Sequence, residues 1–329
     1  MRTPEYLSPS SLKTFEKNKD EFYLKYLADK KPPRLGQTAP MAVGSSFDAY
    51  VKSYLHHSLY GNYGSGDAYK FEVIFEKQVE PHARTLALAD GKIVFDAYKR
   101  SGALADLMLD LNAAIGKPRF EFDIKGFVKT KVGDVPMLGK PDIFFISSEG
   151  ARVIPDWKVN GFYSNSNTSP KKGYIKIRDG WDSSVAKASN NNHMAYKDTY
   201  PVRRLGIMMN TGIDFEEVDA EWADQICVYG WLLGEEVGST NLIAGIEQIV
   251  GNPPKLRIAS HRATPSAAWQ YNLLDRIERT WRAIKSGHYF EELTLEESQQ
   301  RCQDLEDQAA ALAGGDDFAQ FVNETTRNR

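Results

Sequence analysis

Two acidic residues and a lysine stand at the ends of two apolar segments near the middle of the chain. Asp142 directly precedes an apolar run at 143–146, and Asp156 directly follows a second run at 153–155. Lys158 comes two residues after Asp156, so an extended strand would point both side chains to the same face. Two carboxylates and an ammonium group can hold a divalent cation and a polarised water, which is the chemistry of phosphodiester hydrolysis.

The same residues have a simpler explanation, which the wider pattern makes less attractive. An Asp and a Lys two residues apart are most often a solvated strand face or a cross-strand ion pair. Here, however, the tetrapeptide GKPD at 139–142 comes first, and the tripeptide DWK at 156–158 follows in order. The sequence SSEG at 147–150 predicts a turn between them, so the two acids would lie on neighbouring strands of a hairpin.

The elements that must position these side chains can be predicted from periodicity. A helix is expected at 219–234, where Trp222 and Ile226 begin an apolar stripe, and Gln225 lies one helical turn before Tyr229. Alternation predicts a strand at 120–124 that contains Glu121. Further predicted strands are 242–250 and 256–260, and further predicted helices are 7–28, 41–59, 92–100, 103–114, 265–288 and 295–312.

With its third element in place, the sequence resembles the PD-(D/E)XK nuclease superfamily, specifically its RecB-like branch. The elements are the G-x-x-D ending at Asp142, the D-x-K of Asp156 and Lys158, and the Q-x-x-x-Y of Gln225 and Tyr229. The resemblance implies an α/β fold with a restriction-endonuclease-like core, in which helices flank a mixed, twisted β-sheet behind a helical N-terminal region.

The resemblance also implies a role for each site residue. Asp142, Asp156 and the backbone carbonyl of Trp157 would bind Mg²⁺ or Mn²⁺, while Lys158 would orient the attacking water. Glu121 is either a further metal ligand or a surface acid of its strand. In relatives the Gln and Tyr of the third motif line the cleft, which implies that role for Gln225 and Tyr229.

Three features depart from the pattern of the branch. Phe47 stands where relatives often carry a metal-binding histidine, so that either Asp48 contributes instead or the site works from the other carboxylates. No cysteine lies near Asn18, where several relatives bind an iron–sulfur cluster, so we expect no cluster. The chain has no P-loop or other nucleotide-binding motif, so we expect no nucleotide and no motor domain of its own.

The segment 160–217 is a long insertion before the Gln/Tyr helix, and it is basic. From Lys158 to Arg204 the formal charge is +6, whereas residues 291–329 carry −7 within a chain of net charge −3. Lysines and aromatic rings alternate there, which suits phosphates and bases of a nucleic acid, although a solvated insertion with its own small core would look similar. The predicted nucleic-acid-binding residues are Lys171, Lys172, Tyr174, Lys176, Arg178 and Trp181.

Length and composition are those of an ordinary globular protein of 329 residues. We expect a helical region at 1–115, the nuclease core at 116–290, and a C-terminal helix with an acidic tail at 291–329. Cys227 and Cys302 indicate neither a disulfide framework nor a cysteine metal site. No apolar run is long enough for a membrane helix and no signal peptide is recognised, so we expect a cytoplasmic protein of a bacterial or phage-infected cell.

Taken together, these patterns predict a metal-dependent deoxyribonuclease. A stand-alone chain of this size resembles an exonuclease of recombination, repair or phage DNA processing, with DNA ends as substrate and a single-strand-annealing protein or a helicase as partner. The alternatives are a structure- or site-specific endonuclease with the same fold, and a non-catalytic subunit that binds nucleic acid. The sequence leaves the oligomeric state open.

Overall fold

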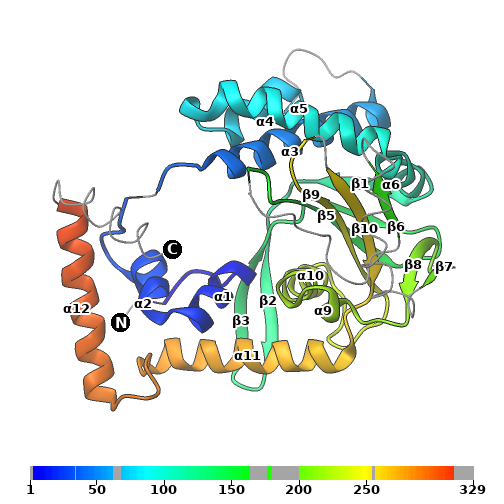
Figure 1. Cartoon of the computed structure of the whole chain (residues 1–329). Coiled ribbons are helices and arrows are strands. Elements are labelled where there is room, and N and C mark those ends of the chain that lie inside the picture. The colour runs from blue at the N-terminus through cyan, green and yellow to red at the C-terminus, as the bar shows by residue number, and fades with distance from the viewer. Residues whose placement is uncertain are drawn as a thin grey trace. The chain divides into compact units, whose positions relative to one another are not determined.

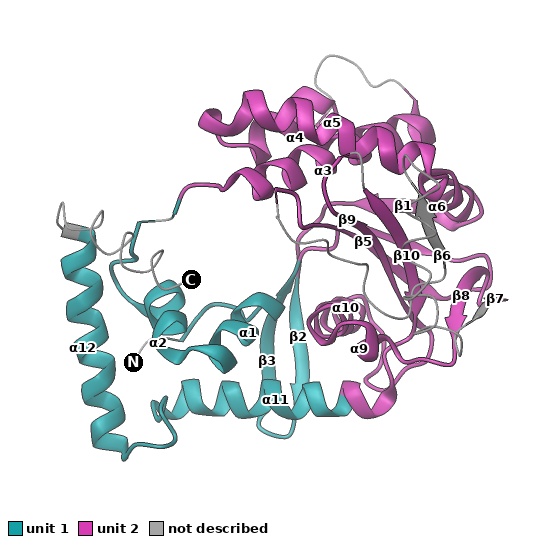
Figure 2. Cartoon of the chain, in the orientation of Figure 1, with its two compact units in different colours: residues 1–35, 125–139, 271–329 teal, residues 36–124, 140–270 magenta. Residues whose placement is uncertain are grey.

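A computed structural model describes residues 3–33, 35–61, 68–163, 176–179, 200–253 and 256–314, with backbone alone at 176–179 and 200–201 (Figure 1). The chain divides into two compact units (Figure 2). One comprises residues 1–35, 125–139 and 271–329, and the other comprises 36–124 and 140–270. The expected N-terminal region and the expected core therefore each contribute residues to both units.

A six-stranded mixed sheet forms the centre of the second unit, in the order β1-β4-β5-β9-β10-β6. Neighbouring strands are antiparallel except for β5 and β9, which run parallel. The strands are β1 (Ile115–Phe120), β4 (Ile143–Ile146), β5 (Arg152–Asn160), β6 (Lys176–Asp179), β9 (Leu242–Val250) and β10 (Arg257–Ala263).

Helices cover both faces of this sheet, as the alternation of β5 shows. Val153 and Trp157 belong to a hydrophobic cluster with α3 (Ala39–Tyr60), α5 (Arg84–Arg100) and α6 (Ala103–Asn112). Ile154 points to the other face, into a cluster with α9 (Phe215–Val218) and α10 (Ala220–Leu232). Figure 1 shows α10 on the opposite side of the sheet from α3 and α5. The described part of the unit also contains α4 (Phe71–Gln78) and the 3₁₀ helix η2 (Pro81–Ala83). The predicted α/β class, with a mixed sheet flanked by helices, is confirmed.

The hairpin predicted around residues 147–150 is confirmed. Phe145 pairs with Val153 across the β4–β5 ladder, and the Ser147 amide donates a hydrogen bond to the Ala151 carbonyl at 2.8 Å. Gly150 closes the turn at φ 88°, a left-handed conformation that glycine adopts without a steric penalty. Because β5 extends to Asn160, it carries both Asp156 and Lys158, as the pattern predicted.

The strand predicted at 120–124 is wrong. β1 ends at Phe120, and β2 (Ile124–Thr130) begins four residues later. Glu121 lies between them at φ +35°, which breaks the extended backbone, while its amide still donates to the Asp142 carbonyl at 2.9 Å. The Glu121 side chain is therefore placed by a turn at the edge of the sheet.

The end of the predicted insertion forms a small hairpin of β7 (Tyr200–Arg204) and β8 (Ile207–Thr211). Gly206 sits in its tight turn at φ +80°, where an added Cβ would approach the Ser148 side chain to 2.6 Å. The hairpin is therefore fixed closely against the β4–β5 turn of the same unit.

The first unit combines the N-terminal helices with β2, β3 (Gly133–Gly139) and two C-terminal helices, α11 (Ala267–Ser286) and α12 (Leu295–Gly314). The single helix predicted at 7–28 is interrupted. α1 (Pro9–Lys17) ends at Asn18, whose side chain caps α2 (Lys19–Phe22), and a π-helical turn η1 (Tyr23–Leu27) follows. Asn18 favours a cap over a helix interior because its side chain bonds backbone amides. No helix among the described residues is long and apolar enough to cross a membrane.

We expect Ser8→Ala to lower the free energy of unfolding by about 1 kcal/mol, because Ser8 is the N-cap of α1. Its hydroxyl accepts from the Ser11 amide at 3.2 Å, and the Ser11 hydroxyl accepts in return from the Ser8 amide at 2.7 Å. Urea denaturation measures the difference. Thr14→Ala, at a partly exposed position of the same helix, is the control and should stay within about 0.5 kcal/mol of the wild type. An equal effect of both changes would contradict the capping role.

Candidate active site

The β4–β5 hairpin brings the carboxyl groups of Asp142 and Asp156 together. Burial raises the pKa of Asp156 well above its usual range, and the neighbouring charge of Asp142 adds to that effect despite the opposing Lys158. Burial acts in the same direction on Asp142, but the ammonium group of Lys52 outweighs it and keeps the Asp142 pKa below its usual range. Only one of these two adjoining acids ionises readily. A further cation at this position would therefore stabilise the ionised form of both.

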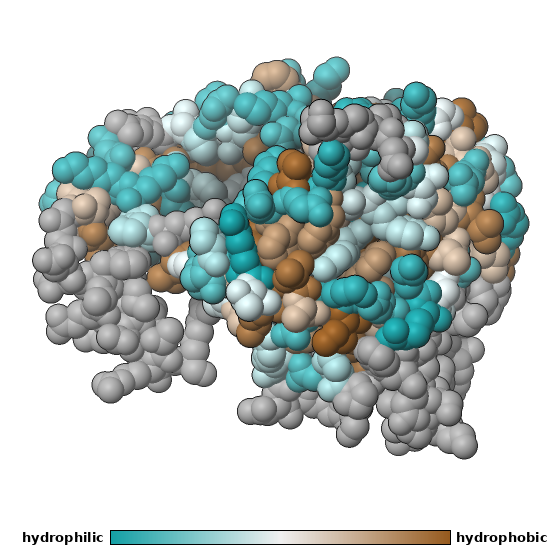
Figure 3. Space-filling view, turned by 90° about the horizontal axis from the view of Figure 1, so that it is seen from above, coloured by the Kyte–Doolittle hydropathy of each residue, from teal (hydrophilic) through white to brown (hydrophobic). Residues whose placement is uncertain are grey.

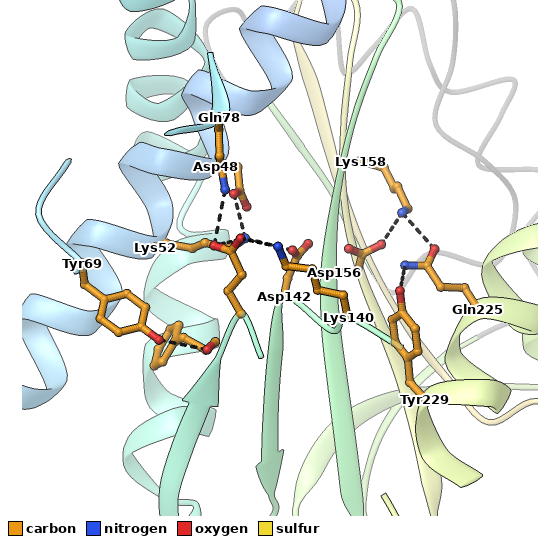
Figure 4. Close-up of polar contacts among 12 residues, drawn as sticks. Asp48, Lys52, Tyr69, Gln78, Lys140, Asp142, Asp156, Lys158, Gln225 and Tyr229 are labelled. Carbon is orange, nitrogen blue, oxygen red and sulfur yellow. Dashed lines mark hydrogen bonds and ion pairs between the residues drawn. The ribbon is translucent and has the colours of Figure 1, made fainter. Parts of the chain in front are cut away.

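Lys158 lies on the same strand as Asp156 and forms an ion pair with it, as the strand period predicted (Figure 4). Its ammonium group also donates to Gln225 Oε1 at 3.2 Å, and Gln225 Nε2 donates to the Tyr229 hydroxyl at 3.1 Å. Burial acts to lower the pKa of Lys158, but Asp156 outweighs it and the pKa is raised. Lys158 is therefore a fixed positive charge, positioned by both an acid and an amide.

The helix that carries Gln225 and Tyr229 is placed by buried apolar contacts. Ile226 is fully buried among sheet residues of the cluster, and Asp219 caps the helix by accepting from the Glu221 amide at 3.0 Å. Gly230 faces the sheet so closely that an added Cβ would lie 2.5 Å from Leu242. The Gln/Tyr motif and the D-x-K strand, 67 residues apart between Lys158 and Gln225, therefore meet in one place.

The nuclease activity expected from the sequence predicts that Gln225→Ala lowers DNA cleavage by roughly tenfold, because Lys158 would lose one of the two groups that hold its ammonium. Gln225→Glu should cleave faster than Gln225→Ala but slower than the wild type, because its carboxylate oxygen can still accept a hydrogen bond from Lys158. Initial rates on end-labelled duplex DNA measure both variants. The neighbouring Asp224→Asn, whose carboxylate accepts from the Trp269 indole at 3.0 Å, is the control and should cut at the wild-type rate. A wild-type rate for Gln225→Ala would rule out this positioning role.

Lys52 is the site residue that sequence reasoning missed. It lies on α3, its side chain is 2% exposed, and its Nζ contacts Asp48 at 2.7 Å, Asp142 at 3.0 Å and Glu121 at 3.4 Å (Figure 4). The one available signal was its position four residues after Asp48, which places both on one face of the predicted helix. Burial opposes its charge, but the surrounding acids outweigh burial and raise the Lys52 pKa, so that the group stays protonated.

Glu121 and Asp48 both face this lysine. Glu121 also pairs with Lys140 at 2.9 Å and accepts from Gln78 Nε2 at 3.4 Å, and the two lysines outweigh burial to lower its pKa. Phe47, at the position where relatives have a histidine, is fully buried and packs edge-on against the Tyr98 ring, with centroids 5.7 Å apart. Phe47 is therefore part of the hydrophobic core.

Burial raises the pKa of Asp48 to about 7 despite the adjoining Lys52. Because the folded state then binds the proton more tightly than the unfolded chain, with a pKa of about 4, stability from this group is present below pH 4 and lost as pH rises toward 7. We therefore expect the wild type to lose stability relative to Asp48→Asn between pH 4 and 7. Thermal melts of both proteins across that range test this, and parallel curves would contradict it.

The charged groups line an open pocket of about 390 Å³. Gly44 and Ser45 of α3 border it on one side, and Trp157 and Lys158 of β5 border it on the other. Lys140 stands half exposed within it. The pocket is large enough for a metal ion, its water molecules and a phosphate group, and the groups around it are predominantly charged.

The residues around the pocket fit a magnesium-type ion. No group of three or more His, Cys, Asp or Glu side chains within the described part of the chain is arranged to hold a metal. Magnesium sites nevertheless commonly use one or two carboxylates, with water and substrate phosphate completing the octahedron. The adjoining Asp142 and Asp156 carboxylates and the Trp157 carbonyl would supply such hard oxygen donors, and all three residues line the pocket.

The predicted nucleic-acid-binding residues are for the most part not described. Lys171, Lys172, Tyr174 and Trp181 lie outside the described residues. Lys176 and Arg178 belong to β6, whose backbone pairs with β10. Their contribution to binding therefore stays a prediction.

Comparison with known proteins gives no relative that assigns a family. No family model matches the chain, and no curated protein matches it. The chain is similar to a solved structure titled "Crystal structure of SSO0001", with 12% identity over 81% of this chain and 84% of that one, and a TM-score of 0.27. A similarity this low supports no inference about fold or function.

Proposed function

We propose that the protein is a metal-dependent deoxyribonuclease of the PD-(D/E)XK type, resembling the RecB-like branch. The observation that carries the proposal is the meeting of Asp142, Asp156 and Lys158 at one pocket. Gln225 and Tyr229, the third element of the resemblance, adjoin the same lysine. Three motifs that are separate in sequence therefore form a single charged site, which an accidental set of motifs would not be expected to do.

The arrangement of the sheet also supports a restriction-endonuclease-like core. Asp142 directly precedes β4 and Asp156 lies on β5 of the same antiparallel hairpin. β9 then pairs in parallel with β5 after α10 has crossed one face of the sheet. This connection places the Gln225 side chain beside the Lys158 end of β5. The proposed core is thus built from the strands and the helix that carry the motifs.

The proposed chemistry is hydrolysis of a phosphodiester bond. A Mg²⁺ or Mn²⁺ ion held by Asp142, Asp156 and the Trp157 carbonyl would polarise the phosphate and lower the pKa of a bound water. The Lys158 ammonium stabilises the negative charge that develops on the phosphate and orients the water through its remaining N–H bonds. Gln225 restricts the orientation of that ammonium, while Asp156 keeps it charged.

Within this class we propose an exonuclease that acts on DNA ends, in recombination, repair or phage DNA processing. The basic insertion at 160–217 would bind the DNA strand, and a helicase or a single-strand-annealing protein would be its partner. A structure- or site-specific endonuclease is the alternative with the same chemistry. These assignments rest on the resemblance and on the charge distribution of the sequence.

The deciding experiment incubates the protein with end-labelled linear duplex, linear single-stranded and closed circular DNA, with Mg²⁺, Mn²⁺ or EDTA. Metal-dependent loss of linear but not circular DNA, absent in Lys158→Ala, is the result expected of an exonuclease. Cutting of circles would assign an endonuclease instead. Equal cutting by Lys158→Ala would show that a contaminant is responsible and would leave the proposal without support.

One observation favours a second candidate function, a non-catalytic subunit that binds nucleic acid. Asp142 and Asp156 each already pair with an ammonium group, from Lys52 and Lys158 respectively. If these pairs persist at millimolar Mg²⁺, the acids remain neutralised and no metal enters. DNA binding without cutting under any of the conditions above would establish this candidate.

A further inference from the structure

Lys52 is a permanent cation inside the acidic cluster. Its ammonium group contacts one oxygen from each of three carboxylates, at 2.7, 3.0 and 3.4 Å, and only 2% of its side chain is exposed. A cation enclosed by carboxylate oxygens from separate elements is the arrangement that proteins otherwise use for a bound metal ion. Here a side chain of the chain itself supplies the charge.

The contact with Asp142 connects this cation to the proposed metal position. Lys52 donates to Oδ1 of Asp142 at 3.0 Å, and the same carboxylate also accepts a hydrogen bond from Asp156. In two-metal nucleases the ions lie about 3.5–4 Å apart and share a carboxylate between them. Asp142 contacts Lys52 and would occupy an equivalent position if the proposed ion were held by Asp142 and Asp156.

We propose that Lys52 takes the place of a second divalent ion, so that the pocket binds one Mg²⁺ or Mn²⁺ per chain. The inference rests on the proposed function, because it presupposes a first ion at Asp142 and Asp156. The inference goes beyond the proposed function in two respects: it states the number of bound ions, and it assigns to Lys52 the role of positioning the Asp142 carboxylate. Lys52 touches the acids and not the reacting atoms, so it is a positioning residue.

Charge balance explains why the lysine excludes a second ion. The four carboxylates of Asp48, Glu121, Asp142 and Asp156 face the three ammonium groups of Lys52, Lys140 and Lys158. With all four carboxylates ionised the formal charge is −1, and one divalent ion makes it +1. A second would make it +3 and would have to enter beside a buried ammonium group, at a high electrostatic cost. Without Lys52 the Asp48–Glu121–Asp142 group lacks its only close shared cation among the described residues.

The test counts bound Mn²⁺ by titration, using the electron paramagnetic resonance signal of the free ion. The proteins are the wild type, Lys52→Met, which keeps the length without the charge, and Lys52→Arg, which keeps the charge. The double variant Asp142→Asn/Asp156→Asn measures ions held elsewhere, such as by the acidic C-terminal sequence. Above that background we expect one ion for the wild type and Lys52→Arg, and two for Lys52→Met.

Each outcome decides a separate point. Two ions on the wild type would overturn the inference and leave the proposed function standing, whereas none above background would reject the metal site and the inference with it. One ion on folded Lys52→Met, with unchanged affinity, would also overturn the inference. Should Lys52→Met fail to fold, the spectrum of the ion bound to the wild type decides, because two ions about 4 Å apart broaden each other's lines.

Discussion

Asp156→Asn should abolish DNA cleavage, by at least about 10³-fold, while the protein stays folded. The proposed ion would lose one of its two carboxylates, and loss of such a charge contact costs several kcal/mol in the transition state. Stability should remain equal or rise, because burial and Asp142 raise the pKa of Asp156 and so make its ionised form costly in the folded state. A substitution that removes activity without loss of stability is a mark of a functional acid.

The comparison needs three measurements on the same samples. Initial cleavage rates and Mn²⁺ affinity should both fall in Asp156→Asn, while the melting temperature should not. Asp134→Asn, which changes an exposed acid on β3, is the matched control and should behave as the wild type in all three. Cleavage by Asp156→Asn within about tenfold of the wild type would refute the assignment of the acid.

Arg262→Met should lower the free energy of unfolding by about 3–5 kcal/mol, the cost of removing one partner of a buried ion pair. Arg262 is 5% exposed and pairs with Glu247, which is 1% exposed, and its guanidinium also donates to the His261 carbonyl at 2.9 Å. The substitution leaves the Glu247 carboxylate buried without this partner. Denaturant titration should show a lower midpoint with an unchanged slope.

Two further variants separate the ion pair from general damage to β10. Glu247→Leu combined with Arg262→Met should recover much of the loss, because no unpaired charge remains. Lys92→Met breaks an exposed pair with Asp96 and should change stability by no more than about 1 kcal/mol. A loss below about 1 kcal/mol in Arg262→Met would show that solvent reaches Glu247 and would remove the basis for this prediction.

The sequence predicted those parts of the site that depend on local spacing. Strand period two was sufficient to place Asp156 beside Lys158. A short turn was sufficient to bring Asp142, directly before the neighbouring strand, close to Asp156. Helical spacing likewise placed Gln225 one turn from Tyr229, and their hydrogen bond follows from it. Within a regular strand or helix, the relative direction of nearby side chains is set by the backbone geometry and does not depend on how the element packs in the fold.

The parts that failed depend on contacts between distant segments. Lys52 reads as an ordinary helix lysine, and it becomes a site residue only because α3 packs on the sheet that carries Asp142. Glu121 was expected on a strand, because alternation does not show that the backbone turns to positive φ there. The break of the first helix at Asn18 has a local cause instead, because a capping side chain there overrides a continuous apolar stripe.

The triangle of acids around Lys52 has a consequence for how the chain can be divided. The lysine and Asp142 lie 90 residues apart, so the recognisable motifs at 142–229 do not include their own counter-charge. A shortened chain beginning at residue 116 would expose the apolar face that α3 covers and would leave Glu121 and Asp142 without that ammonium. The shortest segment that contains the whole site therefore begins before α3. Grafting only the motif-bearing strands onto another scaffold would transfer the carboxylates without the ammonium group of Lys52 that compensates their charge.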